Sequence, residues 1–224
     1  MKVDYVLQGD CLELIKELDD KSVDVSFTSP PYNRVRNDTY AHYDDTLTDY
    51  YSFLVSITDE MLRVSRKQVI VNIQQNHFNK KEVFKYIGHY HDKIKGIVIW
   101  EKTNPQPSTN PRNDGTFSIT NAYEYFFVLG DNSKEFRAYN KITNVITSSI
   151  NNQHIRGHGA VMKKEVCDWF ITNFTSENDI VLDPFMGCGT TAVSCIEHHR
   201  HYIGYELCDE YCDITNKRLM EVVS

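Results

Sequence analysis

Residues 180–192 read Ile-Val-Leu-Asp-Pro-Phe-Met-Gly-Cys-Gly-Thr-Thr-Ala. In this stretch a short apolar run is followed by a turn with two glycines, and the turn leads into a helical pattern over 190–199. Glycines let the backbone approach a ligand closely, and the free N–H groups of a first helical turn attract a carboxylate or phosphate. The spacing Gly187-x-Gly189-x-x-Ala192 is therefore typical of a nucleotide-binding turn, although a tight strand–helix turn has the same pattern.

The residues after this turn supply a further strand and a carboxylate. A strand pattern over 202–205 ends at Glu206, 19 residues after Gly187, where an acidic side chain accepts hydrogen bonds from ribose hydroxyls. No lysine follows Gly189, so the turn is not a phosphate-gripping P-loop. Because 18 residues remain after Glu206, we expect the rest of the sheet to come from the earlier part of the chain, in a circularly permuted order.

Strand-like and helical patterns alternate along the chain. The spacing of apolar residues predicts helices over 11–18, 47–65, 79–90, 163–174, 190–199 and 208–222. Strand-like runs cover 3–7, 23–28, 68–73, 94–100, 123–129, 180–182 and 202–205. This alternation predicts the α/β class, with a doubly wound, mostly parallel, seven-stranded sheet of Rossmann-like layout. One domain over 1–224 is the expected organisation for this length.

A second motif, Thr28-Ser29-Pro30-Pro31-Tyr32-Asn33, follows the strand-like run 23–28. Ligands of open α/β sheets bind outside the carboxyl ends of the strands, and both motifs occupy such positions. Two successive prolines fix φ and remove two N–H donors, which leaves carbonyl acceptors. A serine hydroxyl, these carbonyls and a flat tyrosine ring suit the binding of a planar amine. A Pro-Pro turn beside a core tyrosine is the alternative interpretation.

The net charge of −7 is unevenly distributed. Residues 61–160 carry 14 Lys and Arg against 7 Asp and Glu, so they sum to +7 and the two flanks together sum to −14. A basic middle segment can face phosphates, although a solvated charged face is the plainer interpretation. The chain contains no run of about 18 apolar residues, so we do not expect a membrane span. The six cysteines form no Cys-x-x-Cys pair, so we expect neither a metal site nor disulfides, in a reducing cytoplasm.

Two segments lack any periodicity. Residues 103–120 contain Pro105, Pro107 and Pro111, and residues 140–160 are rich in asparagine. Irregular stretches of this length in a compact domain are usually functional, although they can also be plain connectors. They are therefore candidate functional loops of the chain.

Taken together, these residues resemble a known family, the amino-group DNA methyltransferases. The catalytic tetrapeptide of that family is Asp, Asn or Ser followed by Pro-Pro and Tyr or Phe, and its cofactor loop reads Asp-Pro-Phe-x-Gly-x-Gly-Thr. In the β-group of the family the catalytic motif precedes the cofactor loop, as 29–32 precedes 183–190 here. Shorter matches cover nearly the whole chain, at 9–13, 22–24, 100–102, 104–105, 120–125 and 202–206.

The resemblance implies a class I methyltransferase fold and S-adenosyl-L-methionine as the cofactor. Glu206 would hold the ribose, and Asp10 would accept a hydrogen bond from the adenine amino group with the Cys11 N–H nearby. Asp10 is equally well placed to cap the helix predicted over 11–18. Around the methionine part of the cofactor, the resemblance places Asp183, Phe185, Gly187, Gly189 and Thr190.

The implied reaction is methyl transfer to the exocyclic amino group of a DNA base that is flipped out of the duplex. Cytosine N4 is favoured over adenine N6, because a serine rather than Asp or Asn opens the tetrapeptide. If Ser29 Oγ and the Pro30 carbonyl each accepted a hydrogen bond from the target amino group, the lone pair of its nitrogen would be localised. The candidate catalytic residues are Ser29, Pro30, Pro31 and Tyr32.

DNA is the implied macromolecular partner, with 103–120 and 140–160 as the candidate target-recognition loops. The candidate contacts to phosphates and base edges are Arg34, Arg36, Arg112, His154 and Arg156. Larger recognition insertions of the family are missing, so a homodimer is a further expectation. A cytoplasmic, prokaryotic or phage-encoded protein of a restriction-modification system, with neither membrane nor metal as partner, completes this hypothesis.

Other classes of protein are compatible with part of the sequence. A nicotinamide-dependent oxidoreductase accounts for the glycine turn and Glu206 but gives no role to Ser29–Tyr32. An RNA or protein methyltransferase keeps both motifs and changes the substrate. A non-catalytic DNA-binding subunit keeps the fold without needing an intact tetrapeptide.

Overall fold

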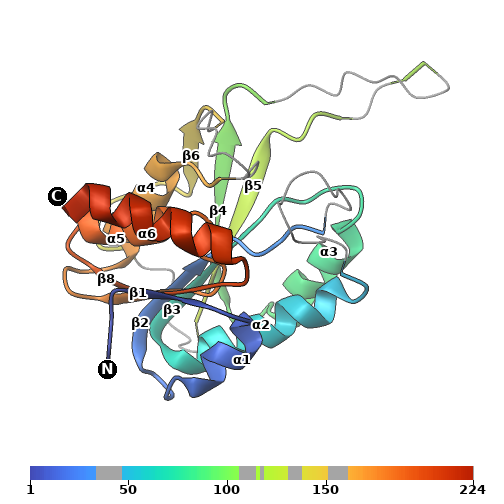
Figure 1. Ribbon diagram of the computed structural model, residues 1–224. Helices are drawn as coiled ribbons and strands as arrows, with labels where there is room; N and C mark the ends of the chain where they lie inside the picture. Colours follow the sequence, from blue (N-terminus) through green and yellow to red (C-terminus); the bar gives the residue numbers. More distant parts are fainter. Residues whose placement is uncertain (34–46, 106–114, 117–118, 131–137, 151–160, 224) are drawn as a thin grey trace.

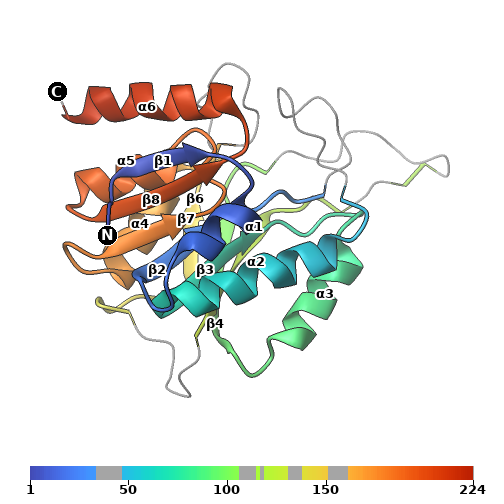
Figure 2. The same cartoon turned by 60° about the horizontal axis from the view of Figure 1, so that its bottom comes forward.

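A twisted sheet forms the centre of the protein (Figures 1 and 2). The computed structural model describes residues 1–33, 47–105, 115–116, 119–130, 138–150 and 161–223. Within them, eight strands are arranged in the order β1-β8-β7-β2-β3-β5-β4-β6. These are β1 (Tyr5–Gln8), β2 (Val23–Thr28), β3 (Ser65–Ile73), β4 (Ile94–Lys102), β5 (Tyr123–Leu129), β6 (Val145–Ser148), β7 (Ile180–Asp183) and β8 (His201–Glu206).

Helices cover both faces of this sheet, as the two views show. One face carries α1 (Cys11–Leu14) with the 3-10 turn η1 (Ile15–Glu17), α2 (Tyr50–Val64) and α3 (Lys80–His89). The other face carries α4 (Lys164–Phe174), α5 (Thr190–Glu197) and α6 (Asp209–Val223). No helix among the described residues is both long and apolar enough to cross a membrane.

The alternation of side chains along each strand builds a separate core on each face. In β3, Val69 and Val71 pack under α2 and α3, whereas Ile70 between them packs under α4. Phe127 and Phe126 of β5 divide between the two cores in the same way. A strand with apolar residues at successive positions is therefore buried on both faces, which explains the continuous apolar runs in the sequence.

The predicted α/β class, the mostly parallel sheet and the permuted order are confirmed. The sheet has eight strands rather than seven, because β6 lies inside the segment 140–160 that was predicted to be irregular. β6 pairs in parallel with the end of β4, and Ile146 packs against the core under α4. The four residues between Asn144 and Ser149 give too short a period-2 pattern to be recognised beforehand.

The topology brings distant segments to one edge of the sheet. β1, β8, β7, β2, β3 and β4 all run in one direction, so their carboxyl ends lie at this edge. β5 runs antiparallel to β3 and β4, so its amino end lies there too. Connections leave β7 and β2 in opposite directions along the sheet, and such a switch point is where open α/β sheets bind ligands.

Candidate active site

The Ser-Pro-Pro-Tyr segment follows β2 at the edge described above. Its end is fixed by two amide side chains from the loop after β3. Asn76 Nδ2 and Asn79 Nδ2 each donate to the Tyr32 carbonyl at 2.8 Å. Asn79 is fully buried, so this anchor belongs to the packed interior rather than to the surface. Pro30 is buried as well, and Ser29 and Pro31 are half-buried.

Side chains of the segment join a polar cluster, which we call the catalytic network: Ser29, Tyr32, Asn72, Lys102 and Glu124. Ser29 Oγ lies 2.8 Å from Tyr32 Oη and donates to Asn72 Oδ1 at 3.0 Å. Tyr32 Oη contacts Asn72 Oδ1 closely and lies 3.1 Å from Glu124 Oε2. The Tyr32 side chain is 7% exposed, so its hydroxyl is enclosed by these partners.

An ion pair forms the far end of the catalytic network. Lys102 Nζ donates to Glu124 Oε1 at 2.6 Å, and both side chains are 8% exposed. They come from β4 and β5, whose antiparallel pairing brings the end of one beside the start of the other. A buried charge is tolerated only when it is paired, so each residue of this pair requires the other.

The cofactor side of the site begins at the end of β7, next to β2. The buried Asp183 carboxylate accepts hydrogen bonds from Thr28 Oγ1 at 2.6 Å, Thr191 Oγ1 at 2.5 Å and Phe185 N at 3.0 Å. Burial raises the pKa of the Asp183 carboxyl group, and the three donors oppose that shift. The Thr28 bond links the strand end before the tetrapeptide directly to the strand end before the glycine turn.

Residues 184–189 contain the turn that the sequence predicts to bind the cofactor, and we call them the cofactor loop; both of its glycines have positive φ. Gly187 has φ 54° and Gly189 has φ 80°, a left-handed region that other residues rarely adopt. A Cβ on Gly189 would lie 2.4 Å from Thr215 Cγ2 on α6. Thr215 Oγ1 donates to the Gly187 carbonyl at 3.0 Å, and Arg218 donates to the Cys188 carbonyl. The loop is therefore fixed through its backbone from α6.

Glu206 closes the loop from the end of β8. Its carboxylate accepts from Gly187 N at 2.8 Å and from Cys208 N at 2.9 Å. Burial raises the pKa of Glu206, the two N–H donors lower it, and the nearby Asp183 raises it further. A carboxylate that is oriented by two backbone donors still has oxygen lone pairs that can accept hydrogen bonds from hydroxyl groups.

Asp10 and Cys11 are brought beside Glu206 by the pairing of β1 with β8. Gly9 N donates to the Glu206 carbonyl at 2.9 Å. The exposed Asp10 caps α1, accepting from Leu12 N at 2.9 Å, which is the structural role foreseen for it as an alternative. Burial raises the pKa of the Cys11 thiol to about 12, with further contributions from Asp10 and Glu206.

This arrangement fits a nucleoside joined to an amino acid. The carboxylates of Glu206 and Asp10 can accept hydrogen bonds from hydroxyl and amino groups. The glycine loop and the first turn of α5, which has no side-chain cap, offer backbone N–H groups to a carboxylate. Phe185 lies partly buried beside the core and Thr190 is buried at the start of α5.

The remaining sequence predictions concern DNA contacts, metal binding and the cysteines. The five candidate DNA contacts Arg34, Arg36, Arg112, His154 and Arg156 lie outside the described residues. In the described ranges, no group of three or more His, Cys, Asp or Glu side chains could hold a metal ion. All six cysteines are free.

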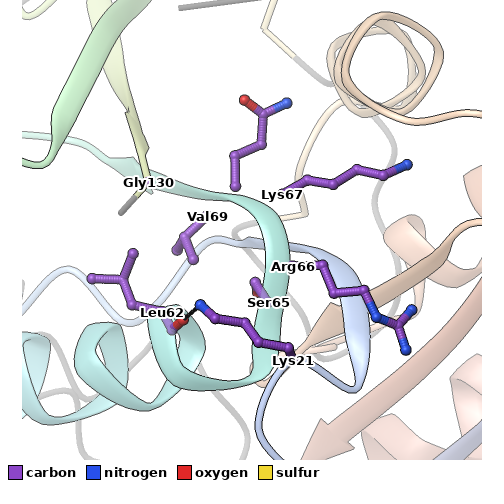
Figure 3. A pocket seen from close by; sticks show the side chains of 8 residues that line it. Lys21, Leu62, Ser65, Arg66, Lys67, Val69 and Gly130 are labelled. Carbon is purple, nitrogen blue, oxygen red and sulfur yellow. Dashed lines mark hydrogen bonds between the residues drawn. The ribbon is translucent and has the colours of Figure 1, made fainter. Parts of the chain in front are cut away.

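Figure 3 shows a pocket at the opposite edge of the sheet. It is lined by Lys21, Leu62, Ser65, Arg66, Lys67, Gln68, Val69 and Gly130. Its lysines already have partners within the chain: Lys21 Nζ donates to the Leu62 carbonyl at 2.7 Å, and Lys67 Nζ lies 2.5 Å from Asp179 Oδ2. The pocket borders the start of β3, away from both motifs.

Sequence reasoning assigned no role to Asn72, Lys102, Glu124, Thr215 or Arg218. A signal was present for Asn72, a polar residue inside the apolar run 69–73, and for Glu124, which lies between two tyrosines, whereas Lys102 lies among polar neighbours. A polar residue within an apolar run is buried with a partner more often than it is solvated, but the partner cannot be identified without the strand order.

Solved structures of similar architecture identify the fold. PvuII DNA methyltransferase, described as cytosine-N4-specific, has a TM-score of 0.78 at 16% identity, covering 99% of this chain and 93% of that one. M1.HpyAVI in complex with S-adenosylmethionine has a TM-score of 0.66 at 23% identity, covering 96% and 98%. The fold is therefore that of the class I methyltransferases.

The family follows from the sequence match. The family model for DNA methylases matches residues 23–217, so this chain belongs to the N6/N4 DNA methylase family, which uses S-adenosyl-L-methionine. The type II beta methyltransferase M.BslI of Bacillus sp. (strain NEB-606) is 28% identical over 96% of this chain. The chain spans 27% of the length of that relative.

Proposed function

We propose that the chain transfers a methyl group from S-adenosyl-L-methionine to the exocyclic amino group of a DNA base, cytosine N4 rather than adenine N6. The 2.6 Å hydrogen bond from Thr28 Oγ1 to Asp183 Oδ1 carries this proposal. It holds the amine-binding acceptors and the cofactor-binding groups side by side at the switch point of the sheet. The alternative function, a nicotinamide-dependent oxidoreductase, gives no role to the hydrogen-bond acceptors of the tetrapeptide.

The cofactor supplies an electrophilic methyl group on a sulfonium centre. Glu206 would accept from the ribose hydroxyls and Asp10 from the adenine amino group, with the Cys11 N–H beside it. The methionine part would be surrounded by the cofactor loop and the start of α5, at Asp183, Phe185, Gly187, Gly189 and Thr190. The direct bonds that Asp183 makes to the loop suggest that it acts by holding the loop in shape.

Ser29 provides the acceptor that the reaction needs. An amino nitrogen conjugated to a base ring is a poor nucleophile, because its lone pair is delocalised. Ser29 donates its own proton to Asn72 Oδ1 at 3.0 Å, which leaves the hydroxyl oxygen as an acceptor for one amino N–H. The Pro30 carbonyl would accept the other N–H, so the enzyme contributes chiefly position and electrostatics.

The preference for cytosine rests on two observations. The tetrapeptide opens with a neutral hydroxyl at Ser29 rather than with Asp or Asn. The PvuII enzyme, whose fold is similar, is described as specific for cytosine N4. The target would be flipped out of the duplex, with the Tyr32 ring as its stacking surface.

DNA docking remains part of the same proposal. Arg34 and Arg36 follow the tetrapeptide directly in the sequence, and Arg112, His154 and Arg156 belong to the two candidate recognition loops. Cations at these positions would contact phosphates and base edges. A second copy of the chain would extend the footprint, and a paired restriction enzyme would fit the type II relative.

The decisive measurement identifies the methylated nucleoside. The full chain is incubated with DNA and S-adenosylmethionine, the DNA is digested, and the nucleosides are separated by mass spectrometry. We expect N4-methyldeoxycytidine. N6-methyldeoxyadenosine would overturn the choice of base. Tight nicotinamide dinucleotide binding with no methylated nucleoside would overturn the proposal as a whole.

A single substitution tests the role of Ser29. Ser29→Ala should lower the methyl-transfer rate about 10- to 100-fold, equivalent to about 1.4 to 2.7 kcal/mol of transition-state stabilisation. Cofactor affinity measured by calorimetry should stay unchanged. The matched control is Ser52→Ala on the exposed side of α2, which should leave the rate as it is. A wild-type rate in Ser29→Ala would remove Ser29 from the chemistry.

A further inference from the structure

The catalytic network extends well beyond the atoms that would touch a base. From Ser29 Oγ it continues for 2.8 Å to Tyr32 Oη and a further 3.1 Å to Glu124 Oε2. Lys102 Nζ lies 2.6 Å from the other carboxylate oxygen. The family match assigns no function to these last two residues, and a buried ion pair costs desolvation that two apolar residues would avoid.

The donors and acceptors of the network can be assigned from its geometry. Asn72 Nδ2 donates to the Tyr125 carbonyl at 3.0 Å, which fixes the amide so that its Oδ1 can only accept. Ser29 and Tyr32 each carry one hydroxyl proton. The Glu124 carboxylate has no proton to donate, so protons in this chain of atoms can move only toward it.

The reaction leaves a proton that has to go somewhere. Once the amino nitrogen has formed a fourth bond, it is positively charged and strongly acidic, because its lone pair no longer conjugates with the ring. A carboxylate in place of Ser29 could take the surplus proton directly. A serine hydroxyl cannot keep one, so it needs a base behind it.

We propose that Glu124 is the final acceptor of the proton released from the methylated amino group, through Ser29 and Tyr32. The nitrogen lone pair would form the N–C bond as the sulfonium S–C bond breaks, and the electrons of the broken bond would stay on sulfur. As the Ser29 hydroxyl turns from Asn72 Oδ1 to Tyr32 Oη, 2.8 Å away, Ser29 Oγ takes the proton from nitrogen and passes its own proton to Tyr32 Oη. The Tyr32 proton then passes to Glu124 Oε2. Ser29 and Tyr32 end as neutral hydroxyls, and the carboxylate becomes a carboxylic acid.

Lys102 has a defined part in this relay. Its ammonium lies 2.6 Å from Glu124 Oε1 and compensates the charge of the carboxylate that accepts the proton. Asn72 is a positioning residue, because it holds both hydroxyls within reach of each other without being able to donate. The inference rests on the proposed amino-group methylation. Its rival is that the ion pair only fastens β4 to β5.

Three variants separate the relay from this rival. Glu124→Gln removes the base, Lys102→Met removes its partner, and the double variant removes both charges. We expect Glu124→Gln to have a lower melting temperature and a single-turnover rate at least about tenfold lower, which corresponds to about 1.4 kcal/mol of activation free energy. The double variant should regain the melting temperature, because no uncompensated charge is left, but not the rate. If Glu124→Gln fails to fold, the double variant still decides the question.

Controls and a second readout complete the design. Glu101→Gln makes the same chemical change on the exposed neighbour of Lys102 and should leave the rate and melting temperature unchanged. All variants should bind S-adenosylmethionine with wild-type affinity by calorimetry. In difference infrared spectra of a single turnover, the wild type should gain a protonated carboxyl band that Glu124→Gln and Tyr32→Phe lack.

The outcomes can be told apart from failure of the proposed function. A double variant that regains both melting temperature and rate, or a wild-type spectrum without the carboxyl band, would overturn the relay. In either case the wild type would still methylate DNA and Ser29→Ala would still be slow. If the wild type methylates no amino group, the proposed function has failed first.

Discussion

The two sides of the site are held together by different kinds of hydrogen bond. In the cofactor loop the decisive hydrogen bonds involve the backbone. Gly187 N donates to the Glu206 carboxylate, and the Gly187 and Cys188 carbonyls accept from side chains of α6. In the catalytic network they run between side chains that include a buried ion pair. The first arrangement depends on φ and close packing, whereas the second depends on charge. The two sides should therefore fail in different ways when they are mutated.

The largest expected effect tests the dependence on charge. Lys102→Met leaves the Glu124 carboxylate buried without its partner, and we expect unfolding in urea to show a loss of about 3 to 5 kcal/mol. Lys95→Met is the matched control on the same strand, since Lys95 Nζ donates to the Asp92 carbonyl at 3.3 Å and has no carboxylate partner among the described residues. A loss below about 1 kcal/mol, the value of a surface pair, would mean that water reaches the pair.

A smaller effect tests the dependence on backbone conformation. Gly189→Ala forces a Cβ into a left-handed residue at 2.4 Å from Thr215 Cγ2, so we expect a loss of about 1 to 3 kcal/mol and weaker cofactor binding. Gly88→Ala in α3 is the control, because a Cβ there meets nothing within 4 Å. Chemical denaturation of both variants measures the difference. Equal stability of the two would show that the loop can shift to make room.

The smallest effect concerns pH. Burial raises the pKa of Glu206 above its usual value of 4.5, so its stabilising contribution is complete below that pH and is lost as pH rises through the folded pKa. Glu206→Gln should flatten this decline in the cofactor-free protein, by less than about 1.4 kcal/mol per pH unit. Asp183 shifts in the same direction, so part of the slope should remain. Urea titrations at several pH values measure the slopes, and identical slopes would contradict the assignment.

The same contrast explains how far the sequence could be interpreted. The glycine turn was predictable as a turn because its geometry is local: a strand, Gly187, Gly189 and a helix follow one another within a few residues. The position of the tetrapeptide at the end of β2 was predictable for the same reason, and the alternation of strands and helices led to the correct class of fold. Only the short β6 was missed, because its polar surroundings hide a four-residue pattern.

The catalytic network could not be predicted, because its members meet only through the order of the strands. Asn72 and Glu124 are 52 residues apart in the sequence and become neighbours because β5 lies antiparallel beside β3. No periodicity in the sequence records which strands pair. A polar residue in an apolar run indicates that a partner exists, but only the sheet shows which one.

The strand order also has a consequence for folding while the chain is being synthesised on the ribosome. β2 lies in the middle of the sheet, where Val25 pairs with Val181 of β7, and Tyr5 of β1 pairs with Ile203 of β8. Until those late strands emerge, β2 has an open edge and β1 has nothing to pair with. Pairings between such distant segments form slowly, and unpaired edges favour aggregation. The nascent chain therefore carries its tetrapeptide early, but the residues proposed to bind the cofactor come together only after residue 206 has been translated.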